Sequence, residues 1–156
     1  DLGQIVRKIV ENRLIPAEKT LAVTVTVAEN LPIIHADETM LQRAISNLVD
    51  NAIKYTPDKG SIHVSIVKSE NKILIAVQDT GFGISPQNKE QLFERHTRIF
   101  RPEFKKIKGT GLGLFIVRSV ARRHDGEAWV ESEEGHGSTF YISIPLEGDN
   151  LLAPED

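Results

Sequence analysis

Gly109-Thr110-Gly111-Leu112-Gly113-Leu114 is the stretch around which the chain is organised. It opens an amphipathic helix that we expect to run to about His124, because residues recur at helical spacing after it: Leu112, Phe115, Ile116, Ser119 and Val120. Glycines at a helix start let the backbone approach a ligand closely, and the free N–H groups of the first turn suit a phosphate. A tight turn or a close helix–sheet contact is the alternative. The stretch matches neither a dinucleotide-binding fingerprint nor a Walker A loop.

The composition is that of one globular domain. The 156 residues are 40% hydrophobic and 26% charged, and no apolar run approaches the roughly 20 residues that a membrane-spanning helix needs. The chain has no cysteine, which excludes disulfides and thiolate metal sites, and its net charge of −3 argues against a nucleic-acid partner. No signal peptide is visible. We therefore predict a cytoplasmic domain, in a protein that is either wholly cytoplasmic or anchored in a membrane.

The two ends of the chain bear on the extent of the domain. The chain begins inside a helical pattern and without Met, which indicates a fragment of a larger protein. Residues 147–156 are acidic and contain Gly and Pro, which is typical of a frayed tail. We therefore expect the folded domain to span residues 1–146 and residues 147–156 to be flexible.

Hydrophobic period and turn residues predict three helices and about five strands. Helices are expected over residues 2–13, 38–55 and from the glycine stretch to 124, with Asp37 as N-cap of the second and Gly126 ending the third. Alternating strands are expected over residues 21–27, 61–67, 72–78, 127–132 and 138–144. The sequence predicts an α+β two-layer sandwich, in which a mixed, mostly antiparallel sheet is covered on one face by the helices.

Three polar residues project from the long central helix. Asn47 and Asn51 are four residues apart and therefore share one face, with Lys54 nearby on the polar side. Asparagine is a mediocre helix former, so two at this spacing invite an explanation. An amide oxygen can ligate Mg²⁺, which also binds phosphate oxygens, and a lysine can meet a phosphate as a point charge. A solvated helix face is the alternative, and the helix alone favours neither.

Two further stretches carry candidate ligand-binding residues. Asp79 ends a strand and precedes Gly81 and Gly83, so it either occupies a turn or accepts a hydrogen bond from an exocyclic amine such as that of adenine. The segment 85–108 is rich in basic residues and would suit a polyphosphate, although a solvated loop is favoured for any single one of them. The basic residues that stand out there are Arg95, Arg98, Arg101, Lys105, Lys106 and Lys108.

Together these stretches resemble the conserved boxes of one family. Residues 47–56, read as NLVDNAIKYT, resemble the N box of sensor histidine kinases, and residues 79–84, DTGFGI, resemble the first glycine box. Residues 92–95, LFER, resemble the start of the F box, and residues 109–114 the second glycine box. Over about residues 1–146 the chain resembles the ATP-binding catalytic domain of a two-component sensor histidine kinase. That domain belongs to the Bergerat-fold superfamily, with DNA gyrase, MutL and the heat-shock-90 chaperones.

The resemblance implies a role for each matching residue. Asn51 would hold Mg²⁺ with the assistance of Asn47, and Asp79 would receive the adenine amino group. Lys54 would contact phosphate and Tyr55 would lie against the nucleotide, while Arg98 would supply a base of the lid that residues 85–108 form. The remaining nucleotide-binding positions are in the two glycine boxes: Gly81, Gly83, Ile84, Gly109, Thr110, Gly111, Leu112, Gly113 and Leu114.

Two departures from the family pattern matter. The hydrolases of the superfamily place a Glu one helical turn before the magnesium Asn, where it activates water as a general base. Here that position is Asn47, which cannot take a proton. The F box is altered as well, because the sequence reads His96-Thr97-Arg98 where aromatic residues are usual. Phe100 or Phe104 are the aromatic residues available to dock the lid instead.

The acceptor of the phosphoryl group is missing from the sequence. A histidine kinase phosphorylates a His on a separate helical-hairpin dimerisation domain, and none of His35, His63, His96, His124 and His136 has that motif context. A structural or solvated role is favoured for each. The resemblance therefore implies partners: the dimerisation domain of the same kinase and a response regulator. The chain on its own would be a monomer.

We interpret the sequence as that of a domain that transfers the γ-phosphoryl group of Mg·ATP to a histidine on that separate domain. The alternatives are a Bergerat-fold ATPase, which Asn47 disfavours, and a serine kinase of the anti-sigma-factor type, which shares the boxes. A nucleotide-sensing module without catalytic activity is supported only by the altered F box.

Overall fold

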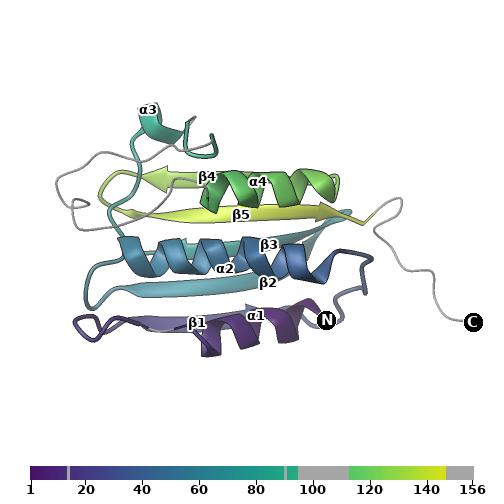
Figure 1. Ribbon diagram of the computed structural model, residues 1–156, viewed down its shortest axis with the longest axis horizontal. Helices are drawn as coiled ribbons and strands as arrows, with labels where there is room; N and C mark the ends of the chain where they lie inside the picture. The colour runs from purple at the N-terminus through teal and green to yellow at the C-terminus, as the bar shows by residue number, and fades with distance from the viewer. Residues whose placement is uncertain (14, 90, 95–112, 147–156) are drawn as a thin grey trace, which may run out of the picture.

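One sheet carries the helices on one face in the computed structural model, which describes residues 1–13, 15–89, 91–94 and 113–146 (Figure 1). Three longer helices, α1 (Leu2–Glu11), α2 (Glu38–Tyr55) and α4 (Gly113–Arg123), lie side by side in front of the sheet, with α2 in the middle. The strands are β1 (Ala22–Val27), β2 (Ser61–Ser69), β3 (Lys72–Asp79), β4 (Glu127–Glu133) and β5 (Gly137–Pro145). The predicted α+β two-layer sandwich is confirmed.

The five strands are ordered β1-β2-β3-β5-β4. β1 pairs with β2 in parallel, and the other three pairings are antiparallel, so the sheet is mixed and mostly antiparallel as predicted. β2 and β3 pair from Ser69 and Lys72 onward, which leaves only Glu70 and Asn71 in the turn. Glu70 has a φ of 54°, the left-handed conformation that such a short turn requires. The turn is thus two residues shorter than the gap between the strands predicted over residues 61–67 and 72–78.

The core lies between the sheet and the helices. Alternate residues of the two central hairpin strands, such as Val64 and Ile75, are fully buried because strand side chains alternate between the two faces. The apolar stripe of α2 is buried as its spacing predicted, and α1 and α4 add to the same core. The buried hydrophobic residues of these helices are Leu2, Val6, Ile9, Leu41, Ala44, Ile45, Leu48, Val49, Ala52, Ile53, Val117, Val120 and Ala121.

Helix α2 begins where the sequence predicted. Asp37 is its N-cap, and the Asp37 carboxylate accepts a hydrogen bond of 3.0 Å from the backbone N–H of Met40. Asp37 is also held from the opposite side, because its own N–H donates to Nε2 of the buried His124 over 3.0 Å. Nδ1 of His124 donates in turn to the carbonyl of Val120 over 2.8 Å. His124 therefore has a structural role: it joins the end of α4 to the start of α2.

Helix α4 ends differently from the prediction. The left-handed residue after it is Asp125, with a φ of 61°, and not Gly126. Gly126 donates its N–H to the carbonyl of Ala121 over 2.8 Å and lies so close to Ser143 that a Cβ would collide with the Ser143 carbonyl. Glycine is thus required there for close helix–sheet approach, while an aspartate supplies the turn that a glycine usually supplies.

One short element was not predicted. Pro86–Lys89 form the helix α3, which lies outside the β4 edge of the sheet, near the end of β4 (Figure 1). A single turn of four residues has too few positions for a periodic pattern, so the sequence gives no helical signal there. Among the described residues, no helix combines the length and the hydrophobicity needed to cross a membrane.

Candidate nucleotide-binding site

Asp79 lies at the end of β3, between its two neighbouring strands. It pairs with Ile62 of β2 and with Ser138 of β5, and it is only 7% exposed. One carboxylate oxygen, Oδ1, accepts a hydrogen bond of 2.9 Å from the N–H of Gly81. Burial raises the pKa of Asp79 above its ordinary value, and the N–H groups of Gly81 and Ser138 oppose that rise only in part. A buried carboxylate in this state favours a ligand that donates a hydrogen bond to it.

Glycines bring three backbone segments close around Asp79. A Cβ on Gly81 would lie 2.5 Å from the Tyr55 carbonyl oxygen and 2.8 Å from Oδ1 of Asp79, so only glycine allows the end of α2 to approach the loop. A Cβ on Gly137, whose φ is 92°, would collide with the Asp79 carbonyl. The folded chain itself therefore needs these glycines, whether or not a ligand is bound.

The other two residues predicted in the first glycine box serve the packing of the domain. Gly83 has a φ of 71°, and a Cβ there would collide with the carbonyl of Glu133 in β4. Ile84 is buried in the hydrophobic core, and its N–H donates to Oγ of Ser132 over 2.8 Å. These contacts fix the loop after Asp79 against the β4–β5 hairpin.

The polar face of α2 carries the residues predicted for metal and phosphate. Asn47 is half-buried, and its Nδ2 donates to the carbonyl of Gly113 at 3.4 Å. This hydrogen bond leaves the amide oxygen Oδ1 available as an acceptor. Asn51 is half-buried and its side-chain amide makes no hydrogen bond to another described residue, while Lys54 is exposed. The structure thus brings Asn47 beside Gly113, the first residue of α4 and a member of the second glycine box.

These residues suit Mg²⁺ only in combination with a phosphate. In the ranges that the structure describes, no cluster of three or more His, Cys, Asp or Glu side chains is placed to hold a metal ion. Mg²⁺ binds few protein oxygens, keeps several waters and takes phosphate oxygens as ligands, so one or two amide oxygens are a fitting protein contribution. The amides of Asn47 and Asn51 are of that kind.

Several predicted site residues lie outside the described residues. These are Arg98, Gly109, Thr110, Gly111 and Leu112, together with Phe100 and Phe104. Of the second glycine box, Gly113 and Leu114 are described: Gly113 accepts the Asn47 hydrogen bond and Leu114 packs against the core. Tyr55 is half-buried at the end of α2, and its carbonyl faces Gly81.

The start of the F box is anchored by residues that the sequence did not single out. Phe93 is buried, and its ring meets that of Phe140 in β5 edge-on, with centroids 6.2 Å apart. The Phe93 ring makes a second contact with α4, where the Arg118 guanidinium lies 4.8 Å from the ring centroid, a cation–π distance. Phe93 thus supplies an aromatic anchor here. Only the fold shows that Phe140 is the partner of Phe93.

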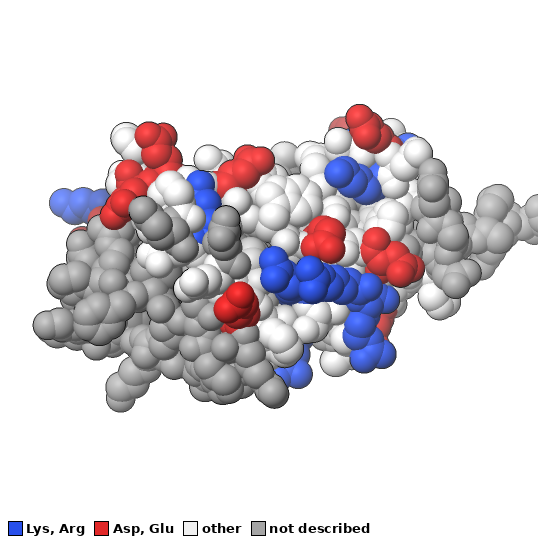
Figure 2. Space-filling view, turned by 90° about the horizontal axis from the view of Figure 1, so that it is seen from above, with Lys and Arg blue, Asp and Glu red and all other residues white. Residues whose placement is uncertain are grey.

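The edge formed by α4 and β4 presents charges of both signs. Figure 2 shows basic side chains in a band with acidic side chains beside them. Arg122 and Glu127 form an ion pair of 3.5 Å there, with both side chains more than half exposed. Such a pair contributes little stability. The described part of this edge is therefore a mixed, solvated surface.

Thr56 is a residue near the site that the sequence reasoning missed. It follows α2 directly, is fully buried, and its hydroxyl has no hydrogen-bond partner among the described residues. Its Cγ2 would collide with a Cβ on Gly60, and the hydroxyl of Thr80 borders the same glycine. The threonine therefore lies among the segments that surround the Asp79 loop. Its place in the quoted N box was the one available signal.

Comparison with known proteins assigns the family. The model of the histidine kinase-, DNA gyrase B- and HSP90-like ATPases matches residues 36–148, and the chain belongs to this family. The adaptive-response sensory kinase SasA of Gloeothece citriformis is 41% identical over 130 residues, which cover 83% of this chain and 33% of the relative. The sensor histidine kinase RppB of Synechocystis is 43% identical over 110 residues, 70% of this chain and 24% of the relative. The chain spans about a third of the length of the SasA relatives it matches.

Solved structures agree with the family and with the predicted fold. The mycobacterial sensor histidine kinase MprB has a TM-score of 0.76 at 28% identity, covering 93% of this chain and 94% of that one. Full-length ShkA in complex with AMPPNP has a TM-score of 0.80 at 28% identity, covering 98% of this chain and 31% of that one. The nucleotide-free catalytic domain of the histidine kinase ThkA has a TM-score of 0.75 at 28% identity, with 92% and 93% covered. The chain has the fold of a histidine kinase catalytic domain.

Proposed function

We propose that this chain binds Mg·ATP and presents the γ-phosphate to a histidine on a separate domain of the same kinase. The observation that carries the proposal is the buried carboxylate of Asp79 in its glycine surroundings, beside the end of the helix that carries Asn47, Asn51 and Lys54. The family is one of ATPases, and the related ShkA was solved with an ATP analogue bound. The two observations support an ATP site at this place.

Within that site the residues divide the nucleotide between them. Asp79 would accept a hydrogen bond from the adenine amino group, because its carboxylate is buried and already oriented by Gly81. Asn51 and Asn47 would offer amide oxygens to Mg²⁺, and Lys54 would lie beside the phosphates. Magnesium, when bound, would neutralise charge on the phosphate oxygens. The chain's own contribution is then positioning, which is the main catalytic factor in phosphoryl transfer.

Transfer to a protein acceptor is favoured over hydrolysis by Asn47. An amide cannot accept a proton from water, and the Nδ2 of Asn47 donates to the carbonyl of Gly113, which holds this side chain in place. A histidine acceptor needs no such base, because its ring nitrogen is itself the nucleophile. The sensor-kinase relatives point to a dimerisation domain and a response regulator as the partners in general. In the proposed arrangement the domain is cytoplasmic.

Two measurements on the chain alone test the proposal. Equilibrium titration with AMPPNP, with and without magnesium, should show binding that magnesium strengthens. Phosphate release from saturating Mg·ATP should then be negligible over many minutes, because water lacks a general base and the acceptor histidine lies on another domain. Steady multiple turnover would instead favour the ATPase alternative, and failure to bind the analogue would exclude an ATP site.

A further inference from the structure

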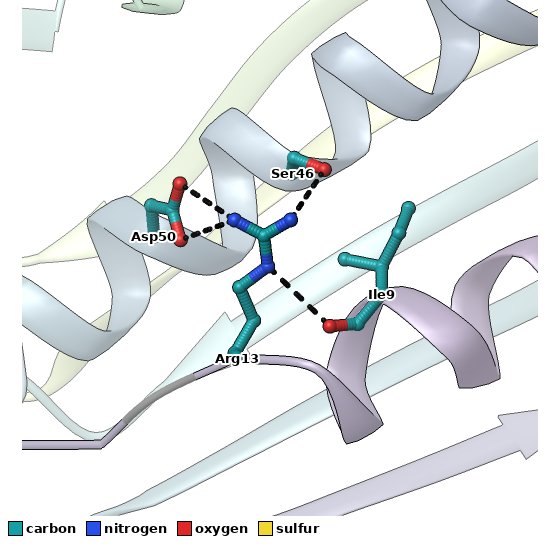
Figure 3. A network of polar contacts seen from close by, with 4 residues as sticks. All are labelled: Ile9, Arg13, Ser46 and Asp50. Carbon is teal, nitrogen blue, oxygen red and sulfur yellow. Dashed lines mark hydrogen bonds and ion pairs between the residues drawn. The ribbon is translucent and has the colours of Figure 1, made fainter.

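The segment between α1 and β1 contacts α2 at several points. Arg13, just after α1, reaches across to α2 with its whole guanidinium group (Figure 3). Nη1 lies 3.2 Å from both carboxylate oxygens of Asp50, and Nη2 donates to Oγ of Ser46 over 3.2 Å. Nε donates to the carbonyl of Ile9 in α1 at 3.4 Å. All three guanidinium nitrogens are therefore engaged, which fixes the side chain between the two helices.

The same segment also holds the C-terminal end of α2. The ammonium group of Lys19 donates to the carbonyls of Ile53 and Lys54, over 2.9 and 3.0 Å. These carbonyls have no partner within a helix that ends at Tyr55, and a cation is favourable at this end of the helix dipole. A third contact follows, because the N–H of Thr20 donates to the carboxylate of Asp58.

These contacts lie next to the predicted metal face. Ser46 directly precedes Asn47, and Asp50 directly precedes Asn51. Consecutive residues are about 100° apart around a helix, so the face that Arg13 contacts lies next to the face that carries Asn47 and Asn51. A rigid helix turns as a unit, so a contact that fixes the rotation of one face fixes the rotation of the other. On the opposite side, Asn47 contacts Gly113 of α4. Helix α2 is thus held between α1 and α4, as Figure 1 shows for the ribbons.

We propose that Arg13 and Lys19 are positioning residues of the nucleotide site. They form a brace that sets the rotation and the end of α2, and so places Asn47, Asn51 and Lys54 for magnesium and phosphate. Arg13 and Lys19 precede the region that the family model matches, residues 36–148. The brace therefore adds to the site a segment that the conserved boxes do not contain. This inference rests on the proposed function, because it concerns the phosphate side of the same site.

The test separates the phosphate side of the site from the base side. The double variant Arg13→Gln/Lys19→Met is compared with the parent chain and with Arg7→Gln, an exposed arginine of α1 that has no partner among the described residues. Dissociation constants are measured for AMPPNP with magnesium, for AMPPNP with EDTA, and for adenosine. The melting temperature of each variant is recorded alongside.

In the double variant we expect magnesium to improve AMPPNP affinity about three- to tenfold less than in the parent. Adenosine affinity and the Arg7→Gln control should match the parent. Arg13→Lys should fall between, because an ammonium group cannot reach both Ser46 and Asp50 in the same fork. It also serves as the milder variant if the double variant does not fold.

Two results would overturn the brace. A lower melting temperature with an unchanged magnesium gain would reduce Arg13 and Lys19 to purely structural residues. An equal loss of adenosine and AMPPNP affinity would mean that the whole domain, and not α2 alone, is disturbed. If the parent chain itself showed no magnesium gain, the proposed function would fail and the brace with it; a parent-like gain in the variant overturns the brace alone.

Discussion

The base end of the candidate site and its phosphate face are built in opposite ways. Around Asp79, backbone segments from α2, β3 and β5 approach so closely that side chains are excluded at Gly81 and Gly137. On α2, by contrast, Asn51 and Lys54 are side chains that make no hydrogen bond within the described chain through their polar groups. The proposed base end is thus already formed by the packing of the chain, whereas the proposed phosphate face presents side-chain groups that await a ligand. Variants of the two regions should therefore fail differently.

The largest effect should come from filling the base end. Gly137→Ala places a Cβ against the Asp79 carbonyl and forces a side chain into positive φ, so we expect a loss of about 3 kcal/mol or more in the free energy of unfolding. Gly135→Ala is the matched control. It has a similar φ of 85° but nothing within 4 Å of a Cβ, and should cost only about 1 kcal/mol. Denaturant unfolding measures both, and equal losses would show that the approach to Asp79 is looser than the structure has it.

Asp79→Asn should separate binding from stability. Loss of the charged acceptor should weaken AMPPNP and adenosine alike by about 100-fold, the scale of one hydrogen bond to a buried charge. The fold should persist, because an asparagine oxygen can still accept the hydrogen bond from Gly81. A variant that binds adenosine like the parent would remove Asp79 from base recognition.

The raised pKa of Asp79 gives this variant a pH signature. A carboxyl group whose pKa is higher in the folded state than in the unfolded state binds a proton more readily when the protein is folded. The free energy of unfolding therefore falls as the pH rises from the unfolded-state pKa of Asp79 through its folded-state pKa. Asp79→Asn should therefore be more stable than the parent at neutral pH and equal to it below both pKa values. A difference that did not depend on pH would assign the stabilisation to another cause.

The periodic spacing of hydrophobic residues predicted the helices and strands well, because these elements depend on residues that are close in sequence. Asp37 caps α2 and the strands alternate because caps and period are properties of neighbouring residues. The roles of Phe140, Arg13 and Lys19 depend on partners far away in sequence, so no local pattern could reveal them. Gly126 was wrongly expected to end α4 because close packing against Ser143 also demands a glycine. The residue-by-residue roles in nucleotide binding stay predictions.

On the phosphate face a single change should have a moderate and selective effect. Asn51→Ala should weaken AMPPNP about tenfold in the presence of magnesium and leave adenosine binding unchanged, because it removes one amide oxygen and touches nothing at the base end. Alanine is the better helix former, so stability should not fall. Arg43→Ala, exposed on the same helix, serves as control. Calorimetric titration in magnesium and in EDTA checks the expectation, and an unchanged magnesium dependence would take Asn51 out of the metal role.

The smallest expected effect concerns Thr56, and it tests whether this residue belongs to the proposed base site. Thr56→Val keeps the shape of a fully buried side chain and removes a hydroxyl that has no partner in the described part of the chain. Removing such a hydroxyl should raise the free energy of unfolding by up to about 1 kcal/mol, because the valine no longer buries an unsatisfied polar atom. Adenosine affinity should not change if the hydroxyl only faces the protein. If the variant is more stable but binds adenosine more weakly, Thr56 belongs to the base site beside Asp79. The lost affinity would then show that the hydroxyl contacts the bound adenosine.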